Sequence, residues 1–144
     1  MRIIAGEAKG RNLAALRGLR TRPTAARVRE ALFDLLGDRI RGASMIDLFA
    51  GTGGVGIEAL SRGARRVVFV EKDAGALRVL RKNIDLCRFS ERAELLAGDV
   101  RSALRKLSRA SEPFDFLFVD PPYGRSVGDE ATEKALLSLP LSEE

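Results

Sequence analysis

The sequence predicts a doubly wound α/β fold, in which helices cover both faces of a mostly parallel sheet. From Ser44 onward, short apolar runs alternate with segments of helical period, a pattern typical of parallel strands joined by helical crossovers. A cluster of glycines from Gly51 to Gly56 follows the first run. The acidic residues Glu71, Asp99 and Asp120 follow the next three runs, and parallel strands bring such residues to one edge of a sheet.

The composition indicates a globular protein and excludes several classes of site. Of the 144 residues, 45% are hydrophobic and 31% are charged, and no apolar run reaches the roughly 20 residues that span a bilayer. We therefore expect no membrane partner, and the N-terminus lacks the pattern of a signal peptide. The chain holds no histidine and a single cysteine, Cys87, so we expect no metal site, no Ser-His-Asp triad and a cytoplasmic location.

The positive charge is concentrated before the glycine cluster. Residues 1–43 hold 10 Lys or Arg and 4 Asp or Glu, whereas residues 44–144 hold 15 and 16. Arginine at this density favours contacts with phosphate groups, and the alternative is a solvated arm that aids solubility. We expect two parts, a basic N-terminal extension over residues 1–43 and an α/β core over residues 44–144.

Within the extension, the sequence predicts a small hairpin and one helix. Residues 2–4 and 12–16 are expected to pair, and residues 17–23 to form a basic loop. A helix capped by Thr24 follows, to about Leu36. We expect Arg27 and Arg29 to face solvent or ligand, away from an apolar stripe of Val28, Ala31, Leu32, Leu35 and Leu36.

The core is predicted to alternate strands with helices. We expect strands over residues 44–49, 66–70, 94–97 and 114–119. The intervening helices are expected over about 54–62, from an Asp73 cap along an apolar seam to Cys87, and from an Asp99 cap to about Leu107. A last helix is expected from Asp129 to about Leu139.

The glycine cluster is the centre of the predicted site. Gly51, Gly53 and Gly56 fit the G-x-G-x-x-G spacing of nucleotide-binding loops. Glu71 follows Gly51 by 20 residues, the offset at which an acid binds a ribose diol, which would suit a nicotinamide-dependent oxidoreductase. Asp47 precedes the glycines, where a carboxylate would repel a pyrophosphate but could hold an ammonium group.

The segment Asp120-Pro121-Pro122-Tyr123, at the end of the fourth predicted strand, is the second chemical feature. Its prolines have no N–H and leave their carbonyls free as acceptors.

Four motifs together resemble the class I S-adenosylmethionine-dependent methyltransferases that act on exocyclic amines of nucleobases: DLFAGTGGVGIEAL, Glu71, Gly98-Asp99 and DPPY. The segments RIIAGEAKGRNL and RPTAARVREALFDLL are similar to one branch, the RsmD-type 16S ribosomal RNA (guanine-N2)-methyltransferases. The resemblance extends to about Gly124. It implies a Rossmann-like methyltransferase sheet, S-adenosyl-L-methionine as the cofactor, and ribosomal RNA or the small ribosomal subunit as the partner.

The resemblance also implies roles for individual residues. It places the methionine end of the cofactor at Asp47 and the glycines, and its ribose at Glu71. The implied cofactor-binding set is Thr24, Asp47, Phe49, Ala50, Gly51, Thr52, Gly53, Glu71, Lys72, Asp99, Val100 and Asp120. The implied catalytic set is Asp120, Pro121, Pro122 and Tyr123, which would hold the target base. A carboxylate and a carbonyl can bond both hydrogens of an exocyclic amine, and a tyrosine can stack on an extruded base. Guanine and adenine both carry such an amine beside a ring acceptor, so this chemistry leaves both open. The expected RNA-binding set is Arg2, Lys9, Arg11, Arg20, Arg22 and Arg27.

Two departures from the family pattern affect these expectations. The segment Ala25-Ala26-Arg27 lacks an acidic residue that is common in the family. The family's sheet continues for further strands, so we expect a sheet truncated after strand four, whose bare edge self-association could cover. The alternatives are an N6-adenine methyltransferase of DNA or RNA, a cofactor- or RNA-binding remnant without activity, and a nicotinamide-dependent oxidoreductase.

Overall fold

The computed structural model describes residues 1–16, 23–109 and 113–121 (of residues 23–25 the backbone only), and the structural statements below concern these residues. They form an all-parallel sheet of four strands in the order β3-β2-β1-β4. The strands are β1 (Ser44–Asp47), β2 (Arg66–Glu71), β3 (Ala93–Ala97) and β4 (Phe116–Phe118). The predicted α/β class is confirmed, with β3 and β4 at the two edges.

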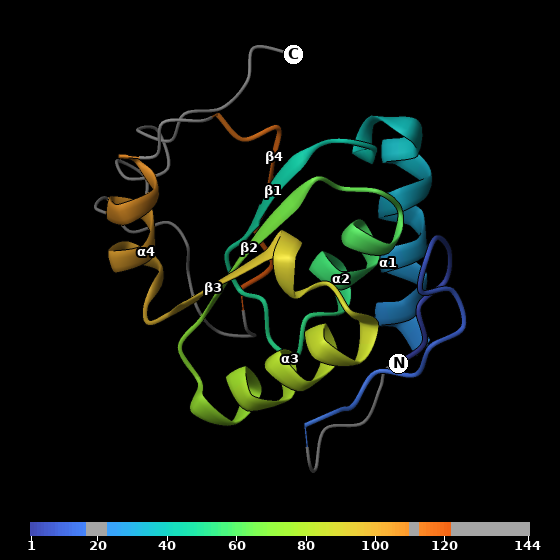
Figure 1. Cartoon of the computed structure of the whole chain (residues 1–144), viewed down its shortest axis with the longest axis horizontal. Coiled ribbons are helices and arrows are strands. Elements are labelled where there is room, and N and C mark those ends of the chain that lie inside the picture. Colours follow the sequence, from blue (N-terminus) through green and yellow to red (C-terminus); the bar gives the residue numbers. More distant parts are fainter. Residues whose placement is uncertain (17–22, 110–112, 122–144) are drawn as a thin grey trace.

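Helices cover both faces of this sheet (Figure 1). The helices α1 (Pro23–Leu36), α2 (Gly54–Ser61) and α3 (Ala74–Cys87) lie on one face, and α4 (Val100–Leu107) lies on the other. Short 3-10 helices span Gly37–Ile40 and Ser90–Arg92. Among the described helices none is long and apolar enough to cross a bilayer.

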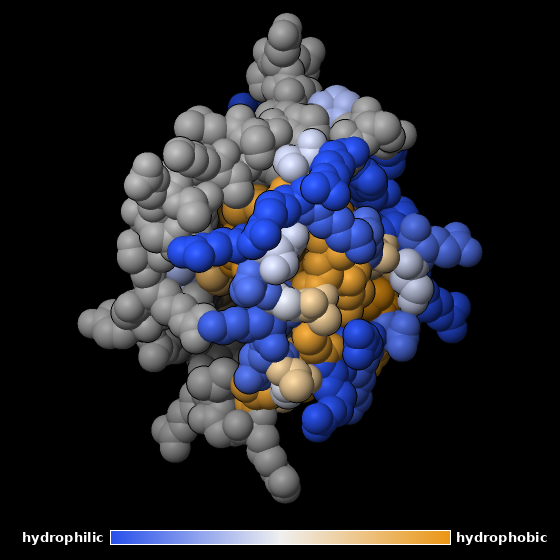
Figure 2. All heavy atoms as spheres, turned by 90° about the vertical axis from the view of Figure 1, so that its left-hand side faces the viewer, coloured by the Kyte–Doolittle hydropathy of each residue, from blue (hydrophilic) through white to orange (hydrophobic). Residues whose placement is uncertain are grey.

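The two faces of the sheet belong to separate hydrophobic clusters because successive side chains of a strand point to opposite sides. In β2, Val67 and Phe69 pack with α2 and α3, whereas Val68 and Val70 pack with α4. All four are fully buried. On the α4 side, several hydrophobic residues are only half-buried, and Figure 2 shows hydrophobic atoms between hydrophilic ones there.

The helix α2 packs unusually close to the sheet because of Gly56. A Cβ atom added at Gly56 would lie only 2.2 Å from the ring of Phe69 in β2. A side chain at this position would therefore push α2 away from the sheet. The glycine fixes the distance between α2 and β2, and with it the position of the loop that leads into α2.

Two predicted helix caps are confirmed. The Asp73 side chain accepts a hydrogen bond from the Ala76 N–H (2.8 Å) at the start of α3. The Asp99 side chain accepts one from the Ser102 N–H (2.8 Å) at the start of α4. Each carboxylate satisfies an N–H group that the first turn of a helix leaves without a partner.

The N-terminal segment forms the predicted hairpin in a reduced form. Its strands meet in one antiparallel bridge between Arg2 and Asn12, supported by a hydrogen bond from the Ile3 N–H to the Arg11 carbonyl (2.9 Å). The side chains of Ile3 and Leu13 are buried in the same cluster as α2 and α3. The hairpin is therefore packed into the core through its apolar residues.

The prediction that the apolar stripe of α1 faces the core is wrong in part. Val28 is 60% exposed and Leu35 is 76% exposed, whereas Arg29 is only 5% exposed and Phe33 only 2%. The helix is turned so that Arg29 reaches Glu58 and the Phe33 ring lies 4.8 Å below the guanidinium of Arg62. Arg29 was expected to face solvent or ligand, and it is instead part of the core. The helical periodicity of this segment is compatible with burial of either of two adjacent faces of α1.

Two strands are shorter than predicted, whereas β2 and β3 are each one residue longer. β1 ends at Asp47 rather than at residue 49, because the chain turns at once into the glycine loop. β4 covers Phe116–Phe118 rather than residues 114–119. The helix expected from Asp129 to Leu139 lies outside the described residues.

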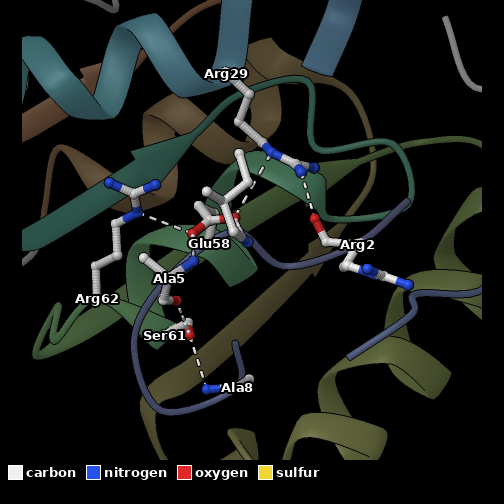
Figure 3. Close-up of polar contacts among 8 residues, drawn as sticks. Arg2, Ala5, Ala8, Arg29, Glu58, Ser61 and Arg62 are labelled. Carbon is white, nitrogen blue, oxygen red and sulfur yellow. Dashed lines mark hydrogen bonds and ion pairs between the residues drawn. The ribbon is translucent and has the colours of Figure 1, made fainter. Parts of the chain in front are cut away.

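A buried carboxylate, Glu58 of α2, joins three segments of the chain (Figure 3). It accepts hydrogen bonds from the N–H groups of Ile4 (2.9 Å) and Ala5 (3.1 Å). It also pairs with Arg62 at 2.9 Å and with Arg29 at 3.7 Å. Its side chain is fully buried, and a buried charge requires partners of this number and quality.

The first prediction concerns this cluster. Glu58→Gln keeps the shape of the side chain but leaves the two guanidinium groups without a counter-charge in a buried site. We expect the free energy of unfolding to fall by about 3 kcal/mol, measured by urea denaturation.

The matched control is Asp38→Asn, which breaks the exposed pair of Asp38 with Arg41. Exposed pairs contribute little because solvent screens them, so the unfolding midpoint of this variant should not change. An equally small effect of Glu58→Gln would contradict the role assigned to the buried cluster.

Candidate functional site

The carboxyl edge of the sheet gathers acidic side chains from all four strand ends. Asp47 ends β1 and Glu71 ends β2, while Asp99 and Asp120 each lie two residues beyond the ends of β3 and β4. Because the strands are all parallel, these residues lie along one edge. The charges of Asp120 and Glu71 both raise the pKa of Asp47, so both carboxylates lie within electrostatic reach of Asp47.

The glycine loop begins directly after β1. The Ala50 N–H donates to the Val70 carbonyl (3.0 Å), and the Gly53 N–H donates to the Ala50 carbonyl (3.0 Å), which closes the turn into α2. Gly51 lies inside this turn with φ +58°, and a Cβ atom added there would meet no other atom within 4 Å. The backbone at Gly51 therefore faces open space, which leaves room for a ligand against the loop.

Glu71 is held in place by backbone N–H groups on both of its carboxylate oxygens. Its Oε1 accepts from the Gly51 N–H (2.8 Å), and its Oε2 accepts from the Asp73 N–H (2.9 Å). Each carboxylate oxygen has two lone pairs, so both retain acceptor capacity for a further donor. The end of β2 thus braces the glycine loop while presenting acceptors beside it.

Asp47 is a buried acid of this edge, and its pKa is raised. It is only 1% exposed, and burial raises its pKa to about 7, although hydrogen bonds from the backbone of Phe49 and Gly56 oppose the rise. Its Oδ1 is buried and has no hydrogen-bond partner. Nearly all buried polar atoms of folded proteins are paired, so an unpaired carboxylate oxygen here suits a ligand that brings a donor or a positive charge.

Asp99 and the end of β3 form a third part of the edge. The Asp99 side chain is exposed, and the hydrogen bond from Ser102 holds its pKa below the usual value. A cavity of about 220 Å³ lies beside it, lined by residues of β3 and α4 that include Leu96, Ala103 and Lys106. Val100, the first residue of α4, is half-buried.

The described part of the expected catalytic segment consists of Asp120 and Pro121. Asp120 is exposed and Pro121 is half-buried, just beyond β4. The end of β4 is held against the end of β1 by a hydrogen bond from the Leu48 N–H to the Phe118 carbonyl (3.1 Å). Pro122 and Tyr123 lie outside the described residues.

The remaining residues of the expected sets take varied positions. Phe49 and Thr52 are half-buried, Ala50 is buried and Lys72 is exposed. The exposed residues of the expected RNA-binding set are Arg2, Lys9, Arg11 and Arg27, of which Arg11 also donates to the Leu86 carbonyl (2.9 Å). Outside the described part lie Arg20, Arg22 and the side chain of Thr24.

Sequence reasoning missed Asn83, which contacts the glycine loop. This fully buried residue of α3 donates through Nδ2 to the Thr52 carbonyl (2.9 Å). The signal was available, because Asn83 lies on the predicted apolar seam of its helix next to Ile84 and one turn after Leu80. A polar residue on such a face usually has a buried hydrogen-bond partner.

The arrangement suits binding of a polar ligand with hydroxyl groups and a positive charge. It offers an open glycine backbone, acceptors at Glu71, a buried acid with an unpaired oxygen, and exposed acceptors at the end of β4. Within the described ranges, no group of three or more Asp, Glu, Cys or His side chains could hold a metal ion.

Comparisons with known proteins show the family to which the chain is related. A family model described as "Conserved hypothetical protein 95" matches residues 1–140. YlbH of Bacillus subtilis, whose name places it provisionally among rRNA methyltransferases, is 40% identical over 139 residues, 96% of this chain and 73% of that protein. Ribosomal RNA small subunit methyltransferase D of Haemophilus influenzae is 38% identical over 132 residues, 91% of this chain and 68% of that protein.

A solved structure shares the architecture. The protein yhhF of Escherichia coli, described provisionally as a methyltransferase, is similar with a TM-score of 0.84 and 36% identity. The similarity covers 100% of this chain and 76% of that one.

The second prediction follows from the pKa of Asp47. Folding raises this pKa from the usual value of an aspartate to about 7, so between these values the folded chain holds a proton that the unfolded chain releases. The contribution of Asp47 to stability therefore falls as the pH rises through this window. Asp47→Asn removes the effect, and we expect its stability relative to the original chain to be greater at about pH 8 than at about pH 5, by roughly 2–3 kcal/mol.

Urea denaturation at the two pH values measures this difference. The control is Glu94→Gln, which removes an exposed carboxylate of β3. A gain for Asp47→Asn of the same size at both pH values would show that Asp47 does not titrate in this window.

Proposed function

The chain belongs to the conserved hypothetical protein 95 family, that of the RsmD- and YlbH-like ribosomal RNA methyltransferases, and from this membership we propose that it methylates the exocyclic N2 amine of a guanine in 16S ribosomal RNA. Its fold is the Rossmann-like methyltransferase fold, as predicted. The methyl donor in this proposal is S-adenosyl-L-methionine, which supplies an electrophilic methyl group on a sulfonium. The observation that carries the proposal is the unpaired, buried Oδ1 of Asp47, which lies within electrostatic reach of Asp120 and of Glu71, the acid that accepts from the Gly51 N–H.

The residues of the carboxyl edge fit the methyl donor. The unpaired Oδ1 of Asp47 offers an acceptor to its ammonium group. A positive charge beside Asp47 would lower the free-energy cost of ionising this buried acid, which supports the assignment. Gly51 leaves its backbone open to the methionine end, and Glu71 offers acceptors to the ribose hydroxyls. Asp99, which lines the cavity at β3, and the adjacent Val100 are assigned to the adenine amine and ring.

The other residues of the cofactor set are proposed on their positions alone. Phe49, Ala50, Thr52 and Gly53 belong to the loop, and Lys72 follows Glu71. Thr24 is proposed from the family pattern.

Asp120 and Pro121 are proposed to hold the target amine. The lone pair of an exocyclic amine is delocalised into the base, so the amine is a weak nucleophile. The Asp120 carboxylate and the Pro121 carbonyl can accept its two hydrogens and turn the lone pair toward the methyl group, and Tyr123 can stack on the base. Positive charge develops on the nitrogen during attack, so these contacts strengthen in the transition state.

The exposed cations of the N-terminal part support an RNA partner. Arg2, Lys9, Arg11 and Arg27 are proposed to contact phosphates of ribosomal RNA, free or within the small subunit, in the cytoplasm. In the described residues β4 pairs on one side with β1. Self-association through the other side of β4 stays a prediction.

The third prediction tests the donor site. Glu71→Gln keeps an oxygen for the Gly51 N–H but loses the carboxylate that would accept from the ribose hydroxyls. We expect S-adenosylmethionine to bind the original chain in calorimetric titration and to bind this variant at least about tenfold more weakly. No heat with the folded original chain would contradict the proposed cofactor, and heat with NAD instead would favour the oxidoreductase alternative.

The fourth prediction tests catalysis. Asp120→Ala should lower the rate of tritiated methyl transfer to 16S ribosomal RNA or 30S particles by about 100-fold, because it removes an acceptor that acts in the transition state. Glu94→Gln should transfer methyl groups at the original rate. Mass spectrometry of the nucleosides separates N2-methylguanosine from N6-methyladenosine. Activity that survives Asp120→Ala would overturn the catalytic assignment, and RNA binding without transfer would favour the inactive remnant.

A further inference from the structure

Asn83 of α3 bonds two segments that lie far apart in the sequence. Its Oδ1 accepts from the Ala14 N–H (2.7 Å), and its Nδ2 donates to the Ala14 carbonyl (3.0 Å) and to the Thr52 carbonyl (2.9 Å). Ala14 belongs to the N-terminal segment and Thr52 to the glycine loop. One carboxamide therefore joins the basic N-terminal segment, residues 1–16, to the glycine loop.

The chemistry of these bonds requires an amide side chain. Ala14 presents one donor and one acceptor, so the carboxamide must offer an acceptor and a donor to it, and a second donor to Thr52. Asn83 is fully buried, so the three bonds are shielded from water. A carboxylate would meet two carbonyl oxygens without a hydrogen, and an apolar side chain would leave three backbone groups unpaired.

The segment beyond Ala14 leads toward the proposed cofactor site. The side chain of Leu16 lies 3.5 Å from the position that a Cβ atom at Gly75 would take, in the first turn of α3. That turn follows Glu71, whose carboxylate braces Gly51 and Asp73. The arginine-rich residues 17–22 follow directly in the sequence.

The hydrogen bonds of Asn83 make the two segments depend on each other. A displacement of the Thr52 carbonyl weakens one bond of the carboxamide, and the same carboxamide positions both backbone groups of Ala14. A ligand that fixes the loop thus favours the orientation of Asn83 that also fixes the N-terminal segment. By thermodynamic linkage, a ligand that fixes the segment favours the loop to the same extent.

We propose that Asn83 is a positioning residue that couples the glycine loop to the basic N-terminal segment, so that the methyl donor and RNA bind cooperatively. The inference rests on the proposed function, because it takes the loop as the donor site and the segment as part of the RNA site. Asn83 itself touches neither ligand. Its role is to couple the two sites, so that a ligand that orders one of them also favours the ordered form of the other.

The test measures the coupling itself. The dissociation constant of S-adenosylmethionine is determined by calorimetry with and without saturating 30S particles that lack the target methyl group. In the original chain, RNA should tighten donor binding at least about fivefold, the lower range of typical couplings. In Asn83→Ala the factor should fall below about twofold.

The control is Ile84→Ala, on the same turn of α3. Ile84 is buried in the hydrophobic cluster, so this variant loses stability through a cavity without losing the bonds to Ala14 or Thr52. Its coupling factor should equal that of the original chain. An unchanged factor in Asn83→Ala, or an equal loss in Ile84→Ala, would overturn the proposal.

A second measurement uses the original chain and so does not depend on the folding of a variant. Addition of S-adenosylmethionine should slow amide hydrogen exchange at least about fivefold at Ala14 as well as in the loop. Protection confined to the loop would overturn the coupling. If the original chain binds the donor and RNA without coupling, this inference fails alone, whereas no donor binding at all contradicts the proposed function itself.

Discussion

The buried carboxylate of Glu58 is the interaction on which most of the tertiary structure depends. It lies on α2 and receives the N–H groups of Ile4 and Ala5 together with the guanidinium groups of Arg29 and Arg62. A charge in this position would be costly without such partners. Because the partners come from the N-terminal hairpin and α1 as well as from α2, Glu58 holds these three segments together.

The position of α2 in turn determines the candidate site. On the sheet side, Gly56 lets α2 approach the ring of Phe69. On the other side, Glu58 anchors the helix to the hairpin. The glycine loop leads into the start of α2 and is braced by Glu71 from β2 and by Asn83 from α3. The loop is therefore held by contacts from several elements, and the open space at Gly51 is where a ligand can approach.

The candidate site is acidic, whereas the N-terminal segment carries exposed positive charges. Burial raises the free-energy cost of ionising Asp47, and the charges of Asp120 and Glu71 raise it further. Such local destabilisation is typical of functional sites, where a ligand supplies the missing partner. Exposed cations such as Arg2 and Lys9 lie on the N-terminal segment instead. Under the proposed function, an acidic centre attracts the cationic donor and keeps phosphates outside, whereas the basic segment holds the RNA backbone.

The local features and their order were predictable from residue patterns along the chain. The alternation of apolar runs and helical segments established the parallel sheet, and Asp73 and Asp99 were recognisable as caps because a cap and the N–H that it binds are three residues apart. The carboxyl edge followed from parallel topology alone. Features that depend on distant partners were decided only by the tertiary structure. Glu58 and Ile4 are 54 residues apart, and Asn83 and Ala14 are 69 apart. Which face of α1 is buried depends on the same contacts, because helical periodicity describes one helix and not the surface against which it packs.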